Sequence, residues 1–259
     1  MKGRSARNPE SGGRPLDQRI LDIFRTDEGR IVSGEQLSGA LQVSRTAVWK
    51  HIKSLRELGY RIEAIPTRGY RLLASPDLLT PAEISAGLKS AKIGLRLVCY
   101  LETGSTNDDA FKLAEEGAEE GTVVVAEAQR RGKGRLGRHW ESPAGVNLYC
   151  SVILRPPILP ARAAQLTFLS VVAAARAIEA VTSLRPSIKW PNDLLLSGKK
   201  VAGLLNEMSA ETEKINFIVL GIGVNINMDR EQFPDDLRHP ATSLFLEAGT
   251  PVRRLDLVR

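Results

Sequence analysis

The sequence contains few of the residues that build disulfides and metal sites: two cysteines and three histidines among 259 residues. Cys99 and Cys150 each lie in an apolar, strand-like run, so we expect reduced, buried thiols of the kind found in cytosolic proteins. Neither has a cysteine or histidine neighbour at metal-ligand spacing, so no metal-binding residues are assigned. His51, His139 and His239 are scattered along the chain, and none is assigned a catalytic role.

Long hydrophobic runs are also lacking. No apolar stretch reaches the length of a membrane span, and the polar, arginine-rich N-terminus has no hydrophobic segment typical of a signal peptide. These two absences predict a cytoplasmic protein without a membrane partner. The apolar content of 42% is ordinary for a globular protein, and the length favours two domains over one.

The excess positive charge is confined to the first part of the chain. Residues 1–75 hold 14 Lys and Arg against 8 Asp and Glu, whereas residues 76–259 hold 22 of each kind. The whole net charge of +6 therefore lies in the first segment. Such an asymmetry predicts a nucleic-acid-binding module ahead of a neutral domain.

Residues 15–74 are predicted to form a winged helix-turn-helix domain, preceded at 1–14 by a polar arm that we expect to be disordered. Ser33 with Gln36 has the spacing of a capping box, which predicts the start of one short helix. Ser44 can cap the next helix after a tight connection. Two helices joined in this way are typical of DNA-binding modules.

The second of these two helices is the predicted DNA reader. Its apolar stripe would face the core, and basic and hydroxyl side chains lie outside that stripe, which suits a helix entering the major groove. Residues 60–73 predict a β-hairpin that would act as a wing. The predicted DNA-binding residues are Arg45, Thr46, Lys50, Lys53 and, at the wing tip, Arg68. The alternative is a small helical domain with solvated basic faces.

Residues 75–259 alternate strand-like and helical segments. This order predicts an α/β (α+β) domain built on a mixed sheet, with helices on one face. The expected strands are 95–101, 122–128, 146–154, 187–190, 194–196, 200–205 and 215–222, and the expected helices are 106–116 and 161–181.

The densest functional signal lies between Arg130 and Arg138, which span three glycines and five basic residues. Glycine lets a backbone approach a ligand closely, and Lys and Arg bind phosphate or carboxylate, so we predict an anion-binding loop. The spacing matches G-x-G-x-x-G, but Gly137 is followed by Pro143, Gly145 and another strand-like run rather than by a helix. A Rossmann motif is therefore excluded, no Walker-type motif is present, and the loop is expected to join two strands.

Four further clusters have residue types that could carry chemistry. Residues 105–107 place hydroxyl and amide groups at a predicted helix start, although helix capping explains their serine equally well. Residues 189–193 put a charge pair and an amide at a strand end. Lys200 precedes Gly203, where a small residue would allow close approach of a ligand, and residues 221–225 follow an apolar strand.

Taken in order, these segments resemble the bifunctional biotin–protein ligases that also act as biotin-operon repressors, over about residues 16–259. The match is specific because five motifs occur in the right order and a wing precedes the linker. The resemblance implies that biotin and ATP, with Mg²⁺, form biotinyl-5′-AMP and pyrophosphate. A lysine of a biotin carboxyl carrier protein of acetyl-CoA carboxylase would then accept the biotinyl group. It also implies a homodimer that binds operator DNA with the adenylate as corepressor.

The resemblance also implies roles for individual residues. Lys200 and Arg135 would be catalytic, because two anions must meet and cations must screen their repulsion. The implied biotin-binding residues are Ser105, Thr106, Asn107, Gln129, Lys133, Gly134, Arg135, Lys200 and Gly203. The implied ATP- or adenylate-binding residues are Gly132, Lys133, Arg135, Arg138, Trp140, Asn192, Lys200 and Asn225.

The sequence departs from the family pattern in two places. Lys133 stands where the family commonly has arginine, and lysine keeps the charge but lacks the bidentate fork, so weaker retention of the adenylate is expected. Family members of this type continue into another helix and a small SH3-like barrel, so we expect a catalytic domain truncated at the C-terminus, without that barrel. Two other functions stay open: a repressor that only senses the adenylate, and a lipoate-type ligase.

Overall fold

The computed structural model describes residues 15–26 and 29–259, and the arm predicted at 1–14 lies outside these residues. The described chain divides into two compact units. Residues 15–26, 29–77 and 81–86 form the N-terminal unit, and residues 78–80 and 87–259 form the C-terminal unit. The short segment 81–86 thus belongs with the first unit, although the sequence predicted that this unit ends at residue 74.

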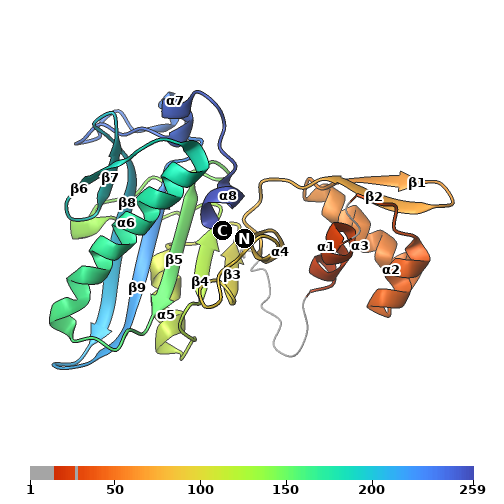
Figure 1. Cartoon of the computed structure of the whole chain (residues 1–259), viewed down its shortest axis with the longest axis horizontal. Coiled ribbons are helices and arrows are strands. Elements are labelled where there is room, and N and C mark those ends of the chain that lie inside the picture. Colours follow the sequence, from red (N-terminus) through yellow and green to blue (C-terminus); the bar gives the residue numbers. More distant parts are fainter. Residues whose placement is uncertain (1–14, 27–28) are drawn as a thin grey trace. The chain divides into compact units, whose positions relative to one another are not determined.

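The N-terminal unit consists of three helices, a two-stranded hairpin and a short fourth helix (Figure 1). These are α1 (Leu16–Thr26), α2 (Gly34–Leu41), α3 (Arg45–Glu57), β1 (Arg61–Ile65), β2 (Gly69–Ala74) and α4 (Pro81–Ser85). The predicted capping box at α2 is confirmed, because the Gln36 N–H donates to Ser33 Oγ at 3.0 Å and Ser33 N–H donates to the Gln36 side chain at 2.8 Å. Ser44 caps α3 by accepting from the Ala47 N–H at 3.1 Å.

The core of the N-terminal unit follows the predicted stripe. Val48, Ile52 and Leu55 are buried and pack with apolar residues of α1 and α2. The wing is fixed to this core because the backbones of Val32 and Tyr70 pair through two 2.9 Å hydrogen bonds. At Gly69 (φ +133°) a Cβ would lie 2.2 Å from the Val32 carbonyl oxygen, so only glycine allows the approach. The winged helix-turn-helix is thus present.

The C-terminal unit is built on a seven-stranded mixed sheet with the order β3-β4-β5-β9-β8-β7-β6. The strands are β3 (Leu97–Tyr100), β4 (Val123–Ala126), β5 (Leu148–Leu154), β6 (Ser187–Lys189), β7 (Asp193–Leu196), β8 (Lys199–Ala210) and β9 (Ile215–Val224). The helices are α5 (Thr106–Glu115), α6 (Ala163–Thr182), α7 (Leu244–Ala248) and α8 (Arg254–Val258), with 3₁₀ turns at Arg135–Gly137, Pro160–Arg162 and Arg230–Gln232. Only β3 and β4 run parallel among these pairs.

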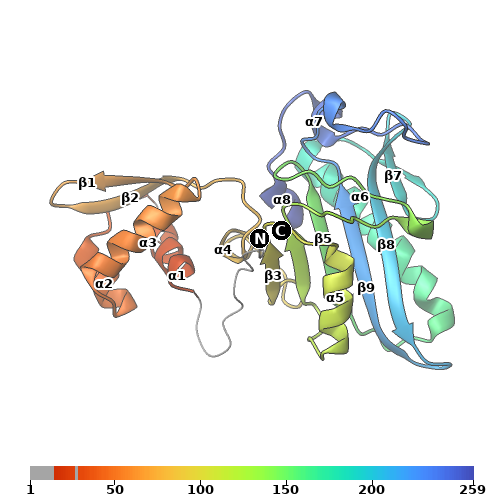
Figure 2. The ribbon, with the colours of Figure 1, turned by 180° about the vertical axis from the view of Figure 1, so that it is seen from behind.

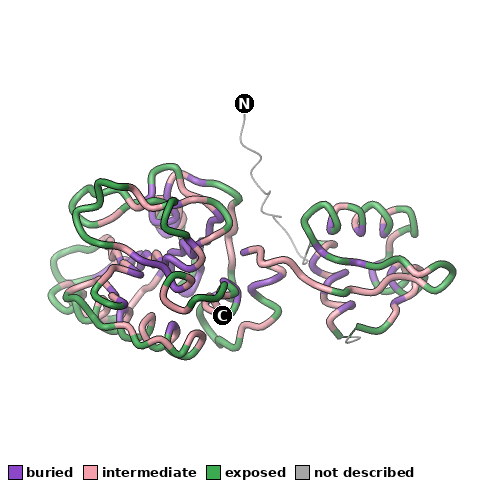
Figure 3. Tube along the Cα trace, turned by 90° about the horizontal axis from the view of Figure 1, so that it is seen from above, coloured by how far each residue is buried: buried purple, intermediate pink, exposed green. Residues whose placement is uncertain are grey.

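The two long helices of this unit cover opposite faces of the sheet. Figure 1 shows α6 in front of the strands, and Figure 2, seen from behind, shows α5 in front. Helix α5 packs through Ala110 and Ala114 on Val124, Ile153 and Val219. Figure 3 shows the buried residues inside each unit and the exposed ones along the loops and outer helix faces. The expectation of helices on one face was wrong, because periodicity reveals which residues are buried but not on which side a helix lies.

Helix α6 carries several apolar side chains that are exposed. Phe168, Leu169 and Val172 are exposed, whereas Val171 and Ile178 are buried. By length and composition alone, Pro160–Thr182 could cross a membrane, so the expectation that no apolar run reaches that length was wrong. One helix of this kind does not distinguish a membrane span from a helix that covers a sheet.

A buried ion pair fastens α8 to the end of β4. Arg254 is 1% exposed, and its Nη1 lies 2.6 Å from Oε2 of Glu127, which follows β4 directly. The other Glu127 oxygen accepts a hydrogen bond from the Leu79 N–H at 2.7 Å. Removing one partner of such a pair leaves a buried charge uncompensated, which costs about 3–5 kcal/mol. Glu127 thereby joins the segments around Leu79 and Arg254 to the end of β4, two residues before Gln129.

Candidate functional site

The glycine- and arginine-rich segment forms an irregular hairpin between β4 and β5, which confirms that it joins two strands. The Trp140 N–H donates to the Gly132 carbonyl at 2.8 Å, and the Gly134 N–H donates to the Arg138 carbonyl at 2.7 Å. A Cβ on Gly132 would lie 2.3 Å from the Trp140 carbonyl oxygen. Glycine is therefore required at 132 by the pairing itself. Residues 132–140 are called the basic hairpin below.

The Trp140 indole, at the end of the basic hairpin, lies against the sheet. A Cβ on Gly223 would be 2.8 Å from the indole, and one on Gly203 would be 3.1 Å from it, so both glycines make room for this ring. The indole Nε1 is buried and has no hydrogen-bond partner among the described residues. Because an unsatisfied buried donor costs about 1–3 kcal/mol, a ligand with a suitable acceptor would be stabilised here.

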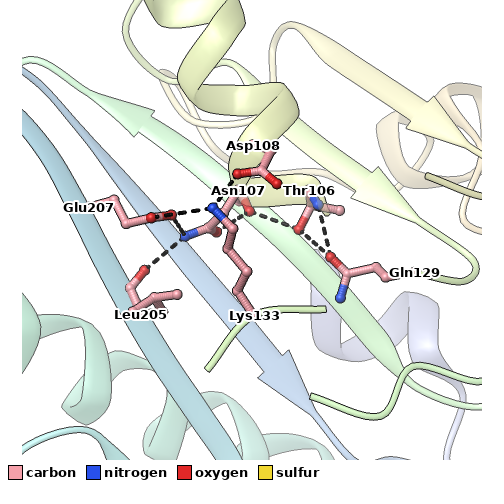
Figure 4. Close-up of polar contacts among 8 residues, drawn as sticks. Thr106, Asn107, Asp108, Gln129, Lys133, Leu205 and Glu207 are labelled. Carbon is pink, nitrogen blue, oxygen red and sulfur yellow. Dashed lines mark hydrogen bonds and ion pairs between the residues drawn. The ribbon is translucent and has the colours of Figure 1, made fainter. Parts of the chain in front are cut away.

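Gln129 faces the start of α5 at the root of the basic hairpin. Its Oε1 accepts hydrogen bonds from the Thr106 N–H at 2.8 Å and the Thr106 hydroxyl at 3.1 Å (Figure 4). Its Nε2 donates to Ser142 Oγ at 3.0 Å. These contacts fix which end of the amide is the acceptor, and they leave one Nε2 hydrogen for another partner.

Asn107 extends this network to β8. Its Nδ2 donates to Glu207 at 2.8 Å and to the Leu205 carbonyl at 3.3 Å (Figure 4). Its Oδ1 lies 2.6 Å from the Ser151 hydroxyl. A Cβ on Gly221 would be 2.1 Å from Asn107 Oδ1, so glycine is needed in β9 to admit the amide. Asn107 is 4% exposed and its orientation is therefore fixed from three strands.

Ser105 occupies the N-cap position of α5 but makes no side-chain capping bond there. The residue is 2% exposed. Helix capping therefore does not explain this serine, and the residue lines the cavity described below.

Lys200 lies at the junction between the sheet and the segment before α7. Its ammonium is 2.7 Å from Asp193 Oδ1 and 5.2 Å from the centre of the Trp140 ring. Its backbone is held on both sides, because Lys200 N–H donates to Pro240 O at 2.8 Å and Lys200 O accepts from the Thr242 N–H at 2.9 Å. The cation is thus positioned without a ligand.

Arg135 contacts the residue after the Trp190–Pro191 pair. Its Nη1 donates to Asn192 Oδ1 at 3.2 Å, and Asn192 Nδ2 donates to the Leu204 carbonyl at 2.7 Å. The peptide bond between Trp190 and Pro191 is cis. Arg135 itself is exposed, so its guanidinium has donors free to bind an anion.

Lys133 points its ammonium between two carboxylates. It pairs with Asp108 at the start of α5, and its Nζ lies 3.6 Å from Glu207 Oε1 on β8 (Figure 4). The hydrogen bond with Asp108 raises the pKa of Lys133 above its usual value; burial opposes this shift, and the charge of Glu207 supports it. The lysine is therefore charged, and its charge is already compensated.

Two cavities meet at Lys200 and Trp140, which line both of them. The first cavity is lined by Ser105, Thr106, Asn107, Gln129, Lys133, Gly134, Arg135, Trp140, Tyr149, Asn192, Lys200, Gly203, Leu204, Leu205, Gly221, Ile222 and Gly223. The second is lined by Arg138, His139, Trp140, Glu141, Lys200, Asn225, Met228, Phe233, Pro234, Asp236, Leu237, Arg238, His239 and Ala241. The volume that the centre of a water molecule can occupy is about 50 Å³ in the first cavity and about 360 Å³ in the second.

The structure thus brings together every residue predicted to bind biotin in the first cavity. Among those predicted to bind the nucleotide, Arg138 and Asn225 lie in the second cavity, and Gly132 lines neither of the two. Asn225 is 5% exposed, and its Nδ2 donates to the Thr242 carbonyl at 3.1 Å.

Sequence reasoning missed several residues of the site. Ser142 and Ser151 lie in ordinary strand or loop sequence, and residues 228–241 carry no motif. Among the missed residues, Asp108 was the one that the sequence could have indicated, because it directly follows the 105–107 cluster. Glu207 could not be found, because the expected strand ended at residue 205, whereas β8 continues to Ala210.

The candidate DNA-binding side chains of the N-terminal unit are exposed. Those on α3 are Arg45, Thr46, Lys50 and Lys53, and Arg68 lies at the wing tip. Arg45 Nη2 lies 3.2 Å from Glu35 Oε2, and both side chains are exposed to solvent. Trp49, which the sequence analysis did not single out, is 53% exposed on the same face, and the Lys53 ammonium lies 5.9 Å from its ring centre.

Comparison with known proteins gives a match for each unit. Residues 101–225 match the biotin/lipoate A/B protein ligase family, and residues 17–71 match a helix-turn-helix domain. The class is therefore a biotin/lipoate-type protein ligase that carries a helix-turn-helix domain.

Relatives along the whole chain narrow this class. The chain is 41% identical over 244 residues to the bifunctional ligase/repressor BirA of Bacillus spizizenii, covering 94% of this chain and 75% of that protein. It is 36% identical over 202 residues to BirA of Escherichia coli, covering 78% and 61% respectively. Biotin protein ligase of Aquifex aeolicus, solved with biotin and ATP, has a TM-score of 0.53 at 32% identity, covering 63% of this chain and 67% of that one. The chain belongs to the family of bifunctional ligase/repressors.

Proposed function

We propose that the chain is an ATP-dependent biotin–protein ligase that also represses a biotin operon, with biotinyl-5′-AMP as corepressor. The observation that carries the ligase proposal is the pair of cavities that share Lys200 and Trp140. A reaction between a carboxylate and a nucleoside triphosphate needs two binding pockets with a cation where they meet. Lys200 supplies that cation, and Asp193 holds it in place.

The first cavity suits biotin. The ureido ring of biotin has two N–H donors and one carbonyl acceptor, and the polar end of the cavity offers the Ser105 hydroxyl, the Thr106 hydroxyl and the Gln129 amide. The Gly203 and Gly223 backbones and the Trp140 ring line the other side. The A. aeolicus ligase, which resembles this unit, was solved with biotin and ATP.

The second cavity suits the nucleotide. Arg138 and Arg238 are basic groups at its rim, and Phe233, Pro234 and Leu237 give it apolar walls that would pack on an adenine ring. At the junction, Arg135 and Lys200 would bind the triphosphate, with Asn192 orienting Arg135. Mg²⁺ would arrive as part of the MgATP substrate.

The first step would place a carboxylate oxygen of biotin against the α-phosphorus of ATP. The bond from that phosphorus to the bridging oxygen breaks, pyrophosphate leaves, and biotinyl-5′-AMP forms. Charge builds on the α-phosphate oxygens during this displacement. A positioned cation in a partly buried site stabilises that charge, and Lys200 is 28% exposed with its ammonium already oriented.

The second step would transfer the biotinyl group to a lysine of a biotin carboxyl carrier protein. The neutral acceptor amine attacks the carbonyl carbon of the mixed anhydride, the bond from that carbon to the AMP oxygen breaks, AMP leaves, and the nitrogen loses a proton to solvent as the amide forms. Asp193 pairs with Lys200 and would keep that cation in place while the amine attacks. The basic hairpin would cover the adenylate until the acceptor arrives, which limits its hydrolysis.

Exchange of labelled pyrophosphate into ATP tests this proposal directly. We expect exchange that depends on biotin and is absent with lipoate. Exchange with lipoate alone would identify a lipoate-type ligase. Binding of biotinyl-5′-AMP without any exchange would identify a sensor that only represses.

The DNA-binding proposal rests on the winged unit and on the exposed basic face of α3. Arg45, Lys50 and Lys53 would contact the backbone and base edges of the major groove, with Thr46 near the helix start and Arg68 at the flank. We also propose that two copies bind a two-fold operator when the adenylate is present. Residues 205–210 of β8 pair with β9 but not with β7, so this part of the described sheet has an edge that a second copy could extend.

Selection of duplexes from a random DNA pool would test the repressor proposal, with and without biotinyl-5′-AMP. We expect enrichment of a two-fold symmetric site, stronger with the adenylate. Recovery of no preferred sequence in either condition would overturn it. We expect both activities to take place in the cytoplasm.

A further inference from the structure

The contacts of Lys133 differ from those expected of an anion ligand. Its ammonium lies between Asp108 and Glu207, and these come from two separate elements, α5 and β8. Two carboxylates around one ammonium leave a local charge of −1, which disfavours an approaching phosphate or carboxylate. Arg135, by contrast, is held by a neutral amide and keeps its full positive charge available.

We propose that Asp108 and Glu207 are positioning residues of the ligase, which hold Lys133 and thereby keep the basic hairpin closed over the first cavity. The hairpin is anchored at both ends. Lys133 fastens its first strand to α5 and β8, and Trp140 fastens its second strand against Gly203 and Gly223. Its tip between these anchors carries Leu136, which is 87% exposed.

The Lys133 anchor is coupled to the polar end of the first cavity. Glu207 accepts a hydrogen bond from Asn107 through one oxygen and pairs with Lys133 through the other (Figure 4). Asp108 lies next to Asn107 at the start of α5. A ligand that contacts residues 105–107 therefore contacts the same helix turn that holds the hairpin. Occupancy of the first cavity and closure of the hairpin are thus connected through one network.

This arrangement assigns different tasks to the cations of the hairpin. Lys133 holds the hairpin to the unit, and Arg135 is left to bind the reacting anions. Loss of the anchor would let the hairpin open, so the adenylate would escape faster while the groups that promote its formation stay in place. The kinetic part of this inference rests on the proposed ligase function, whereas closure of the hairpin does not.

Limited proteolysis tests closure without any ligand. Trypsin cleaves after lysine and arginine, and the exposed Arg135 and Arg138 make the hairpin a substrate when it opens. An Asp108→Asn/Glu207→Gln variant keeps the side-chain shapes and the acceptor for Asn107 but removes both charges. We expect hairpin cleavage about fivefold faster than in the wild type, the size expected for losing two partly exposed ion pairs.

The matched control removes the same charge from α5 and from the residue that follows β8. Glu115 ends α5 and Glu211 directly follows β8, and both are exposed. A Glu115→Gln/Glu211→Gln variant should be cleaved at the wild-type rate. Lys133→Arg should restore a slow rate relative to Lys133→Met, and Lys133→Met should add nothing to the Asp108→Asn/Glu207→Gln variant, because both changes break the same contacts.

Single-turnover experiments with preformed biotinyl-5′-AMP give the second measurement. The Asp108→Asn/Glu207→Gln variant should release the adenylate about fivefold faster and show a raised KM for biotin, with kcat for pyrophosphate exchange within about twofold of the wild type. Wild-type cleavage in that variant, additive effects with Lys133→Met, or a fall in kcat without faster release would each overturn the proposal. A wild-type protein without biotin-dependent exchange would overturn the ligase function alone, because the proteolysis result does not depend on it.

Discussion

The two units present their candidate side chains in opposite ways. In the C-terminal unit they are held by other side chains or by the backbone: Lys200 by Asp193, Gln129 by Thr106 and Asn192 by the Leu204 carbonyl. In the N-terminal unit, Lys50 and Arg68 are exposed and have no ion pair within the described part of the chain. A site that performs chemistry is preorganised by internal contacts, whereas a surface that reads DNA keeps its charges available to phosphates and bases.

The largest effect should come from the cation that both cavities share. Lys200→Ala is expected to lower biotin-dependent pyrophosphate exchange by roughly a hundredfold or more, the loss typical of one preorganised charge contact. Lys199→Ala is the control, because the neighbouring lysine pairs with Glu247 away from Asp193. Near-normal exchange in Lys200→Ala would mean that preorganisation at this position has no catalytic use, and the contrast between the units would fail.

The corresponding change in the N-terminal unit should act on DNA alone. Arg45→Ala/Lys50→Ala is expected to weaken binding to a selected duplex by about tenfold or more and to lower the salt dependence of binding by roughly 0.9 per lost phosphate contact. Fluorescence anisotropy over a range of salt concentrations measures both. Pyrophosphate exchange should stay normal. Unchanged affinity and an unchanged salt slope would show that α3 is not the helix that contacts DNA.

Trp49 sharpens the comparison, because it is an aromatic side chain left exposed on a basic face. The one apolar group on major-groove base edges is the thymine methyl. Trp49→Ala is expected to weaken binding to a selected duplex by roughly threefold to tenfold, and replacing thymine by deoxyuridine should weaken the wild type but not this variant. Leu58→Ala, which removes another exposed apolar side chain near the end of α3, is the control. Equal sensitivity of both proteins to deoxyuridine would exclude this contact.

The smallest effect is expected for Glu247, whose carboxylate pairs with Lys199 in the strand that also contains Lys200. Hydrogen bonds from Thr242 and Ser197 lower the pKa of Glu247 below its usual value, with Lys199 adding to the shift and burial opposing it. A lowered folded pKa stabilises the protein above the unfolded value of 4.5, and that contribution is lost as the pH falls through the folded pKa. Glu247→Gln should lower the free energy of unfolding at pH 7 by about 0.5–1.5 kcal/mol.

Thermal melts of this variant at two pH values provide the check. The difference in Tm from the wild type should be a few degrees at pH 7 and should shrink well below pH 4.5, where Glu247 is protonated in both states. A difference that grows on acidification would contradict the lowered pKa. Exchange activity should change by less than about threefold, since Glu247 contacts neither cavity.

Local features of the fold could be predicted from the sequence. The capping box at Ser33 and Gln36, the cap at Ser44 and the strand–loop–strand form of the basic hairpin all depend on residues within a few positions of one another. The predicted biotin-binding residues do gather in the first cavity, although they were predicted through a family resemblance. Their individual roles stay predictions.

The features that could not be predicted depend on contacts between distant residues. Position 133 is basic in the sequence and was expected to bind an anion, but its partners are 25 and 74 residues away, at Asp108 and Glu207. The length of β8 and the placement of α5 and α6 on opposite faces depend on the whole sheet. Residues 228–241 line a cavity through their position beside Lys200 rather than through a recognisable pattern.

The buried pair between Glu127 and Arg254 has a consequence for how the protein is made. Its partners are 127 residues apart, so on the ribosome the strand that leads into the basic hairpin is synthesised long before its counter-charge. The N-terminal unit, which is built largely from contacts between neighbouring elements, can be complete by then. A nascent chain would therefore fold its DNA-binding unit first. The buried charge of Glu127 in the catalytic unit would be compensated only when residue 254 leaves the exit tunnel.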